Sequence, residues 1–445
     1  MYCTIGMVSL GCAKNQVDAE VMLGLLSQNG YKIVNESAEA DIILVNTCGF
    51  IGPAKEESIN AILEQAQYKK TGRCKALIVT GCLGERYKDE LMQEIPEIDA
   101  VVGTGNYTKI VDVLNEITAG KHGSYYGNID MPMGEVLPRI ISTNGPTAYL
   151  KIAEGCDNYC TYCIIPQLRG KFRSKPISSV IQEATDLVNK GIREFIIIAQ
   201  DITRYGQESK GSFSLVSLLK ELCKIPDLKW IRLMYCYPDR ITEELINLIA
   251  QEDKICCYMD IPIQHINQQI LLKMNRASGS NNIRILLKTI RERIPQIIIR
   301  TSLIVGFPGE GEEEFNELVS FVQEGYFNHI GVFPYSQEEG TKAAAFINQV
   351  DDVIKEERRN QIMSVQKKVS KRLNKAKVGQ IFEVLIEGLE SKDLYYGRSY
   401  GEAPGIDGLV YVYSVEPLKV GDFVDTIITK SYEYDLLGEV YESGE

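Results

Sequence analysis

The chain has 445 residues, enough for two to four domains, and its 44% hydrophobic and 24% charged content is ordinary for a globular protein. This composition excludes a disordered, collagenous or coiled-coil chain. Its net charge is −12, from 48 Lys and Arg against 60 Asp and Glu, whereas a plain polyanion-binding protein is usually basic. Because no apolar stretch is long enough to span a bilayer and no leader pattern opens the chain, we expect a cytoplasmic protein with no membrane segment.

The N-terminal part of the chain alternates between strand and helix patterns. Its β-branched apolar segments are typical of buried parallel strands, and they lie at 7–10, 41–45 and 76–80. Helical patterns follow these segments, at 18–28, 55–68, 83–93 and 109–117. The alternation predicts an α/β domain with a doubly wound parallel sheet over 1–120, followed by a Gly- and Pro-containing linker at 121–147.

The alternation resumes with a longer period in the middle of the chain. Six candidate strands lie at 149–153, 194–199, 230–235, 258–263, 297–305 and 329–333. Six such units predict a partial (β/α)6 barrel over 148–350, shorter than the roughly 250 residues of a closed eightfold barrel. A polar, basic connecting helix is predicted at 351–376, and Gly- and Pro-punctuated β segments predict a small all-β domain over 377–445.

The sharpest chemical signal is a C-x3-C-x2-C run formed by Cys156, Cys160 and Cys163, just after the first strand of the predicted barrel. Three thiolates on one short loop can hold three irons of a [4Fe–4S] cluster and leave the fourth iron open to another ligand. A structural zinc would need a fourth ligand nearby, but no Cys or His follows before Cys223. The spacing therefore favours an open-sited iron–sulfur cluster over unrelated cysteines.

A second set of cysteines is related by topology. Cys12, Cys48 and Cys82 each come directly after one of the three predicted N-terminal strands. Because the carboxyl ends of parallel strands share one edge of a sheet, we expect these thiols to converge there, and three thiols again leave one iron open. The alternative is that each is a small buried core residue, a common role for cysteine.

Several motifs allow a family to be named. The loop with Cys156, Cys160 and Cys163 resembles the signature of the radical S-adenosylmethionine (SAM) superfamily. With the upstream cysteines, the linker and a C-terminal module similar to a TRAM domain, essentially the whole chain resembles the methylthiotransferase family. The stretches most similar to its RimO-type subgroup, which modifies a ribosomal protein, lie at 8–15, 151–156, 164–170, 199–206 and 397–404.

The resemblance implies an activity. Family members add a methylthio group to an unactivated carbon, here the β-carbon of an aspartate in the twelfth small-subunit ribosomal protein. Such a carbon offers neither an acidic proton nor a leaving group, so cofactors must carry the chemistry. The resemblance implies two [4Fe–4S] clusters, two molecules of SAM and an external electron donor, with the edge of the N-terminal sheet capping the mouth of the barrel.

Five further residues are candidates for SAM contacts: Tyr162, Gln200, Arg232, Ile304 and Gly306. The resemblance places Tyr162, Ile304 and Gly306 near the adenine, whereas Gln200 ends a predicted barrel strand and Arg232 is a candidate partner for the SAM carboxylate. Ordinary barrel packing, or a structural ion pair in the case of Arg232, is the alternative for each residue.

The C-terminal charge bears on the substrate. Residues 377–445 carry 5 basic and 14 acidic side chains, a net of −9, whereas an RNA-binding surface would be basic. An acidic module suits a basic ribosomal protein or the small ribosomal subunit, so this partner is favoured over tRNA, although the acidic surface can also serve solubility alone. The alternatives are a tRNA adenosine methylthiotransferase, a non-catalytic iron–sulfur module and a zinc-stabilised structural protein.

Overall fold

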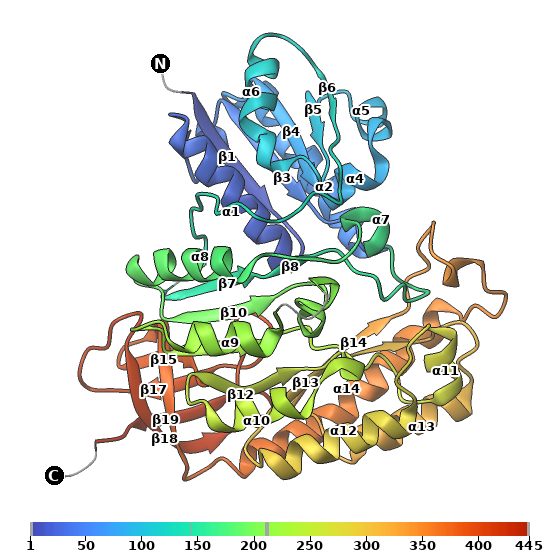
Figure 1. Ribbon diagram of the computed structural model, residues 1–445, viewed down its shortest axis with the longest axis vertical. Coiled ribbons are helices and arrows are strands. Elements are labelled where there is room, and N and C mark those ends of the chain that lie inside the picture. Colours follow the sequence, from blue (N-terminus) through green and yellow to red (C-terminus); the bar gives the residue numbers. More distant parts are fainter. Residues whose placement is uncertain (1–2, 144, 210–212, 443–445) are drawn as a thin grey trace.

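A computed structural model describes residues 3–143, 145–209 and 213–442. It consists of an N-terminal six-stranded sheet, a central six-stranded sheet and a closed five-stranded C-terminal barrel, and Figure 1 shows the first and last of these against different sides of the central domain. The predicted fold class is therefore confirmed. No helix in the described part of the chain combines the length and the apolar character that a bilayer crossing requires.

The N-terminal sheet is entirely parallel and has the order β2-β1-β3-β4-β5-β6. Its strands are β1 (Thr4–Ser9), β2 (Lys32–Ile33), β3 (Ile42–Thr47), β4 (Ala76–Gly81), β5 (Ala100–Val102) and β6 (Gly123–Tyr125). The three predicted strands are present as β1, β3 and β4. The others escaped prediction because two or three residues are too few for a hydrophobic pattern, and β6 begins within the segment expected to be a linker.

Helices cover both faces of this sheet. They are α1 (Ala13–Gln28), α2 (Gly52–Ala66), α3 (Tyr68–Thr71), α4 (Cys82–Tyr87), α5 (Asp89–Glu94) and α6 (Ile110–Thr118). The single helix predicted at 83–93 is wrong, because Lys88 adopts a left-handed conformation with φ of 49° and separates α4 from α5.

The central sheet is also parallel, with the order β14-β13-β12-β11-β10-β7. Its strands are β7 (Thr147–Lys151), β10 (Glu194–Ile198), β11 (Trp230–Leu233), β12 (Ile255–Asp260), β13 (Ile298–Val305) and β14 (His329–Pro334). Between them run α8 (Ile177–Asn189), α9 (Leu215–Cys223), α10 (Glu243–Gln251), α11 (Gln268–Lys273), α12 (Ser280–Arg293) and α13 (Glu312–Gln323). All six predicted strands are therefore present in an open, partial barrel.

Two short elements interrupt the first βα connection of the central domain. A two-stranded hairpin pairs β8 (Ala153–Glu154) with β9 (Arg173–Ser174), and α7 (Ile165–Arg169) lies between these strands. The cysteine loop at 156–163 therefore starts at the end of β8 and leads directly into α7.

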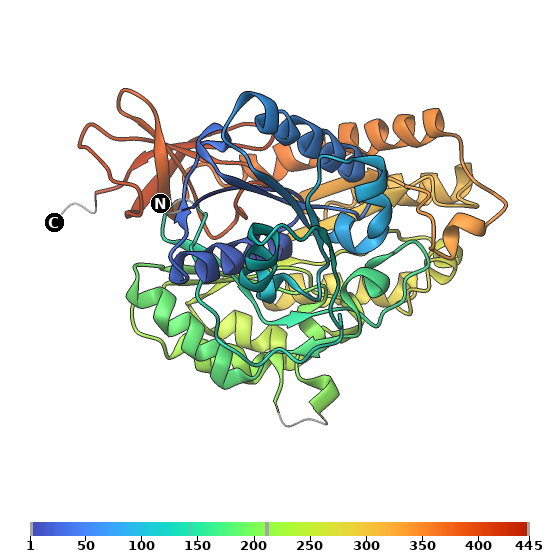
Figure 2. The same cartoon turned by 90° about the horizontal axis from the view of Figure 1, so that it is seen from above.

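The C-terminal part begins with the predicted connecting helix, α14 (Asp352–Lys375). The barrel that follows has the order β15-β16-β17-β19-β18 and consists of β15 (Ile381–Ser391), β16 (Leu394–Arg398), β17 (Val410–Tyr413), β18 (Phe423–Ser431) and β19 (Leu436–Val440). In Figure 2, α14 and this barrel lie along one side of the molecule and most helices of the central domain along the other. Leu385 and Ala403 of the C-terminal part pack with Trp230 and Tyr258 of the central sheet.

A candidate active site between the N-terminal and central domains

The first set of predicted ligands comes together at the carboxyl edge of the N-terminal sheet. Cys12 precedes α1, Cys48 follows β3 and Cys82 is the first residue of α4. A Cβ atom built on Gly11 would lie 2.8 Å from Cβ of Cys48, and one on Gly49 would lie 2.9 Å from the carbonyl carbon of Cys82. The three cysteine loops therefore approach one another so closely that glycine is required beside them.

The surroundings of Cys12 favour its thiolate form. Burial by itself raises the pKa of this thiol, but the Lys14 ammonium, the Arg169 guanidinium and the backbone N–H groups of Asn15 and Lys14 outweigh burial, so that the pKa is lowered from its ordinary value. A thiolate is the form of cysteine that binds metal.

The other two thiols of this set have raised pKa values, and neighbouring thiols contribute to both shifts. Burial, together with the nearby thiols of Cys82 and Cys12, raises the pKa of Cys48 to about 11. Burial also raises the pKa of Cys82, although Arg169 acts in the opposite direction. Two of the three thiols are thus disfavoured as thiolates by burial and by their neighbours, and a positively charged group bound among them would favour the thiolate form.

The second set of predicted ligands lies on the loop between β8 and α7. The backbone N–H of Cys163 donates to the carbonyl oxygen of Cys160 at 3.0 Å, which folds the loop tightly. Burial raises the pKa of Cys156 to about 11, with a further contribution from Cys160, and burial with the other two thiols raises that of Cys163. The Arg276 guanidinium lies 3.9 Å from Sγ of Cys160, so a fixed cation is next to this set as well.

Arg169 joins the two sets of thiols. It ends α7, six positions after Cys163, and its Nε and Nη2 atoms each lie 3.4 Å from Sγ of Cys82. Its Nη2 also donates to Asn15 at 3.0 Å, and its Nη1 pairs with Asp18 and, at 3.3 Å, with Glu154. This buried guanidinium therefore ties the loop of one thiol set to a thiol of the other.

Apolar packing brings the same two loops together. Ile164, the residue directly after Cys163, packs in one buried cluster with Cys82 and Leu168, and Phe50 packs against it. The cysteine loop of the central domain thus lies directly against the edge of the N-terminal sheet.

Gln200 lies at the end of β10, next to this junction. Its Nε2 donates to Oε1 of Glu154 at 2.6 Å. Among the described residues, its Oε1 and the Oδ1 of Asn158 in the cysteine loop are buried without a hydrogen-bond donor. Two unsatisfied acceptors beside the thiols fit a ligand that carries donors, as SAM does with its amino and hydroxyl groups.

Tyr162 and Ile304, the predicted adenine contacts, pack against the same apolar cluster. This cluster is buried and includes Phe307 and Met274. The hydroxyl of Tyr162 is 3.4 Å from Nη1 of Arg276. These two residues therefore form an apolar wall beside the second thiol set.

Gly306 follows β13 with φ of 69°, and its N–H donates to Oε1 of Glu310 at 2.9 Å. A Cβ at this position would lie 2.2 Å from Cγ of Lys355 on α14, so packing against that helix already requires the glycine. The packing against α14 thus explains the glycine at position 306 without any contact to SAM.

The prediction for Arg232 is wrong. Its guanidinium is fully buried, donates through Nε to Glu194 at 3.0 Å, and donates through Nη1 and Nη2 to the backbone carbonyls of Tyr400 and Ser399. Arg398 of the C-terminal barrel pairs with the same Glu194 at 2.7 Å. Arg232 therefore joins the central sheet to the C-terminal domain, and its donors are not available to a SAM carboxylate.

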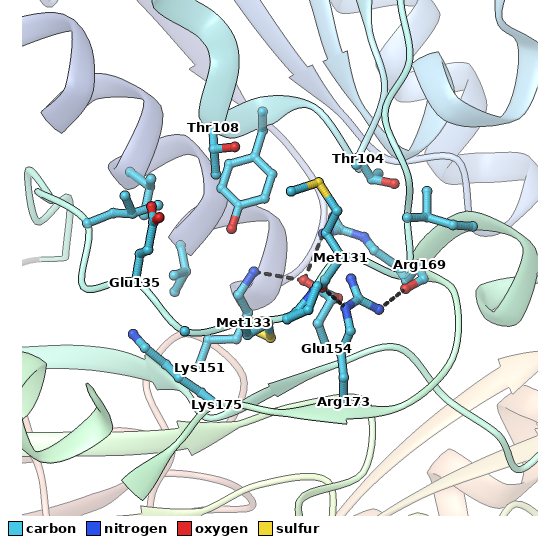
Figure 3. Close-up of a pocket in the computed structure, with 18 of the residues that line it drawn as sticks. Thr104, Thr108, Met131, Met133, Glu135, Lys151, Glu154, Arg169, Arg173 and Lys175 are labelled. Carbon is cyan, nitrogen blue, oxygen red and sulfur yellow. Dashed lines mark hydrogen bonds and ion pairs between the residues drawn. The ribbon is translucent and has the colours of Figure 1, made fainter. Parts of the chain in front are cut away.

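A cavity of about 360 Å³ has Arg169 in its wall, and Cys82 is not among the residues that line it. Figure 3 shows Arg169 and Lys151 meeting Glu154 in its wall, with Met131 and Met133 of the interdomain segment beside them. Lys151 is paired with Asp18 and Glu154, so most of the positive charge in this wall is already neutralised.

The thiols suit an iron–sulfur cluster chemically. In the described ranges, no three His, Cys, Asp or Glu side chains are arranged to hold a single metal ion. Each set nevertheless supplies three soft sulfur donors beside a guanidinium, with glycines that let a bulky group approach at the N-terminal set. Hydrogen bonds from Arg169 to Cys82 are of the kind that tunes cluster potentials in proteins.

Sequence reasoning missed Lys14, Glu154, Arg169 and Arg276. Arg169 and Glu154 lie within stretches that resemble the family, but nothing local marks them as special. The sulfur that Arg169 contacts belongs to a residue 87 positions away, and the sulfur beside Arg276 to one 116 positions away. Only the folded chain brings these charges to the thiols.

Comparison with known families agrees with this geometry. Residues 4–103 match uncharacterized protein family UPF0004, residues 150–322 match the radical SAM superfamily, and residues 378–440 match the TRAM domain. The fold and the cysteine loop thus define a radical SAM enzyme, a class that uses a [4Fe–4S] cluster and SAM.

Individual relatives narrow the class. The ribosomal protein uS12 methylthiotransferase RimO of Desulforamulus reducens is 52% identical over 98% of this chain and 99% of its own length, and that of Clostridioides difficile is 50% identical over 98% of each. This chain belongs to the RimO family of methylthiotransferases.

Solved structures support the fold alone. The radical SAM methyltransferase TsrM from Kitasatospora setae, with a tryptophan substrate and a SAM analogue bound, aligns with a TM-score of 0.57 at 14% identity, over 75% of this chain and 73% of that one. The cobalamin-dependent radical SAM enzyme OxsB aligns with a TM-score of 0.52 at 12% identity, over 82% of this chain and 56% of that one.

Proposed function

We propose that this enzyme adds a methylthio group to the β-carbon of an aspartate in ribosomal protein uS12, using two [4Fe–4S] clusters and two molecules of SAM. The observation that carries the proposal is the meeting of two three-thiol sets, from different domains, on either side of Arg169 and Ile164. The substrate is the one printed in the names of relatives about 50% identical over nearly the whole chain.

The two thiol sets have different proposed roles. Cys156, Cys160 and Cys163 hold the cluster that, with SAM, supplies the radical chemistry for an unactivated C–H bond. The set at the N-terminal sheet edge holds the second cluster, which carries the sulfur to be transferred. Electrons come from an external donor in this proposal, because reductive cleavage of SAM consumes an electron that has to be supplied to the cluster.

Several side chains position SAM in this proposal. Gln200 and Asn158 offer buried, unsatisfied acceptors to its donors. Tyr162 and Ile304 supply an apolar wall that keeps water from the adenine side. Gly306 contributes its backbone at the end of β13, as the family resemblance implies.

Charge supports a protein substrate. The C-terminal barrel and its flanks, residues 377–445, carry 5 basic and 14 acidic side chains, a net charge of −9. Basic ribosomal proteins are attracted by such a surface, whereas an RNA phosphate backbone is repelled.

The proposal is tested by mass spectrometry of ribosomal proteins from cells with and without the gene. We expect uS12 to lose the mass of one methylthio group, on one aspartate, when the gene is deleted. Unchanged uS12 together with the loss of a methylthio group from tRNA would overturn the proposal in favour of a tRNA adenosine substrate.

A further inference from the structure

Lys14 is a largely buried cation that pairs with no carboxylate among the described residues, although it acts on the Cys12 thiol. Its side chain lies in the first turn of α1, and the residue is only 8% exposed. The other buried lysines, Lys151, Lys175 and Lys355, all pair with carboxylates. Within the ranges that the structure covers, no carboxylate lies within 4.0 Å of Nζ of Lys14, which instead sits 3.4 Å from the centre of the Tyr235 ring.

The contact with the Tyr235 ring compensates for only part of the cost of burying the Lys14 ammonium. Withdrawing a cation from water costs several kcal/mol unless an anion or several acceptors replace the water, and a cation–π contact returns only about 0.5 to 2 kcal/mol. The Tyr235 ring thus holds the ammonium in place without neutralising it. Such a position is suited to a ligand that brings a negative charge.

The position of Lys14 links it to both thiol sets. Cys12 of the N-terminal set is two residues away, and Lys14 lowers its pKa. Tyr235 lies just beyond the carboxyl end of β11, and two residues further Tyr237 packs against Arg276 at 4.4 Å, the guanidinium that lies beside Cys160. Lys14 therefore lies where the N-terminal thiol set meets the loop of the central domain that leads, through Tyr237 and Arg276, to Cys160.

The geometry points to Lys14 as the binding site for the side-chain carboxylate of the aspartate that is modified. This inference rests on the proposed function, and it assigns the selection of aspartate in the substrate protein to the Lys14 ammonium. The β-carbon of an aspartate is bonded directly to the carboxylate carbon, so an ion pair with Lys14 fixes the β-carbon where the two domains meet. An asparagine has the same shape but no charge, and Lys14 would discriminate against it.

The alternative role of Lys14 is to balance the negative charge of a cluster bound through Cys12, without any contact to the substrate. The two uses differ in what they predict. A carboxylate site changes the preference for aspartate over asparagine, whereas a charge-balancing residue changes only the properties of the cluster.

The test measures binding of uS12, taken from cells that lack the gene, to the SAM-loaded holoenzyme kept oxidised so that no reaction occurs. Its modified aspartate is compared with asparagine at the same position. We expect the enzyme to prefer aspartate by on the order of 30-fold, the worth of a buried charge pair of about 2 kcal/mol. Lys14→Met should abolish the preference, and Lys14→Arg should retain most of it.

The matched control is Lys69→Met. Lys69 is also mostly buried, with 22% of its side chain exposed, but it pairs with Asp99 at 2.6 Å in the N-terminal domain, away from both thiol sets. This variant should bind both forms of uS12 as the parent enzyme does. SAM cleavage without uS12 checks that each variant retains its first cluster.

Each outcome decides the inference. A preference for aspartate that survives in Lys14→Met overturns it, as does the absence of any preference in the parent enzyme, a result that does not depend on whether the variant folds. An altered visible or paramagnetic spectrum of the N-terminal cluster with an unchanged preference assigns Lys14 to charge balance instead. If the binding results agree with the inference but the reduced enzyme adds no methylthio group, the proposed function fails and the carboxylate site stands.

Discussion

The two thiol sets are built in opposite ways. Cys156, Cys160 and Cys163 lie on one loop, and a tight local turn is enough to gather them. Cys12 and the two other N-terminal thiols come from three loops that meet only because β1, β3 and β4 are neighbours in a parallel sheet. The first set depends on a short sequence motif, whereas the second depends on the fold of a whole domain.

Their electrostatic surroundings differ as well. Arg169 approaches Cys82 with two N–H groups at 3.4 Å, whereas Arg276 approaches Cys160 with one at 3.9 Å. The N-terminal set also has Lys14 beside it. The set that depends on the fold is therefore the one more strongly surrounded by positive charge.

The largest expected effects separate the roles of the two sets. Cys156→Ser should abolish both SAM cleavage and methylthio transfer, because it removes a ligand of the first cluster. Cys82→Ser should abolish methylthio transfer but leave SAM cleavage intact. Assays of 5′-deoxyadenosine and of modified uS12 on the same preparations check this, and loss of SAM cleavage in both variants would contradict the division of roles.

A second prediction concerns the junction between the sets. Arg169→Met leaves Asp18 and Glu154 with less positive charge in a buried site and removes both contacts to Cys82, so we expect a loss of about 3–5 kcal/mol in the free energy of unfolding. Iron should fall from about eight to about four atoms per chain as the N-terminal cluster is lost. Chemical denaturation and iron analysis measure the two effects.

The control for this variant is Arg173→Met. Arg173 also lines the cavity of Figure 3, but it donates only to the backbone carbonyls of Met131, Arg169 and Lys171. Its loss should leave the iron content unchanged. Equal iron loss in both variants would show that the cavity wall as a whole, rather than the contact to Cys82, retains the cluster.

A third prediction concerns the pH dependence of stability at the junction between the central sheet and the C-terminal barrel, where Glu194 pairs with Arg232 and Arg398. Burial raises the pKa of Glu194, but Arg398 and Arg232 outweigh burial and lower it from 4.5 to about 2. Because the folded-state pKa is depressed, Glu194 stabilises the protein above pH 4.5, by about 3 kcal/mol, and this contribution is lost as the pH falls towards 2.

Glu194→Gln should therefore be less stable at neutral pH and should depend less on pH between 4.5 and 2. The single tryptophan, Trp230, packs edge-on against Phe423 of the C-terminal barrel with ring centres 4.9 Å apart. Its fluorescence during urea unfolding of the cofactor-free protein reports this junction directly. The same pH dependence in parent and variant would show that another group controls the acid response.

The smallest expected effect is at Tyr162. Tyr162→Phe keeps the ring in its apolar cluster and removes only a hydroxyl that lies 3.4 Å from Arg276. A hydrogen bond to a charged guanidinium is worth about 1.5–3 kcal/mol, and the long 3.4 Å contact belongs at the lower end, so the KM for SAM should rise by about tenfold at most, with kcat unchanged. A large fall in kcat would place the hydroxyl in the chemistry itself.

The sequence predicted what depends on local pattern or on regular topology. The cysteine loop is a short motif, and the convergence of Cys12, Cys48 and Cys82 follows from the strand order of a parallel sheet. The break at Lys88 was missed because a single left-handed residue leaves the helical pattern around it unchanged.

Contacts between domains could not be predicted from the sequence. Arg232 was assigned to SAM because it lies on a barrel strand, but its partners at 399 and 400 lie in a domain whose docking no local pattern predicts. Arg169 and Lys14 were missed for the same reason, since their contacts to Cys82 and Tyr235 cross from one domain to the other.

The most direct test of the account is the position of iron in crystals of the anaerobically reconstituted enzyme, located by anomalous diffraction. We predict two separate iron clusters, one bound by Cys12, Cys48 and Cys82 and one by Cys156, Cys160 and Cys163, with Arg169 between them. A single cluster at the cysteine loop, with the N-terminal thiols free of metal, would contradict it.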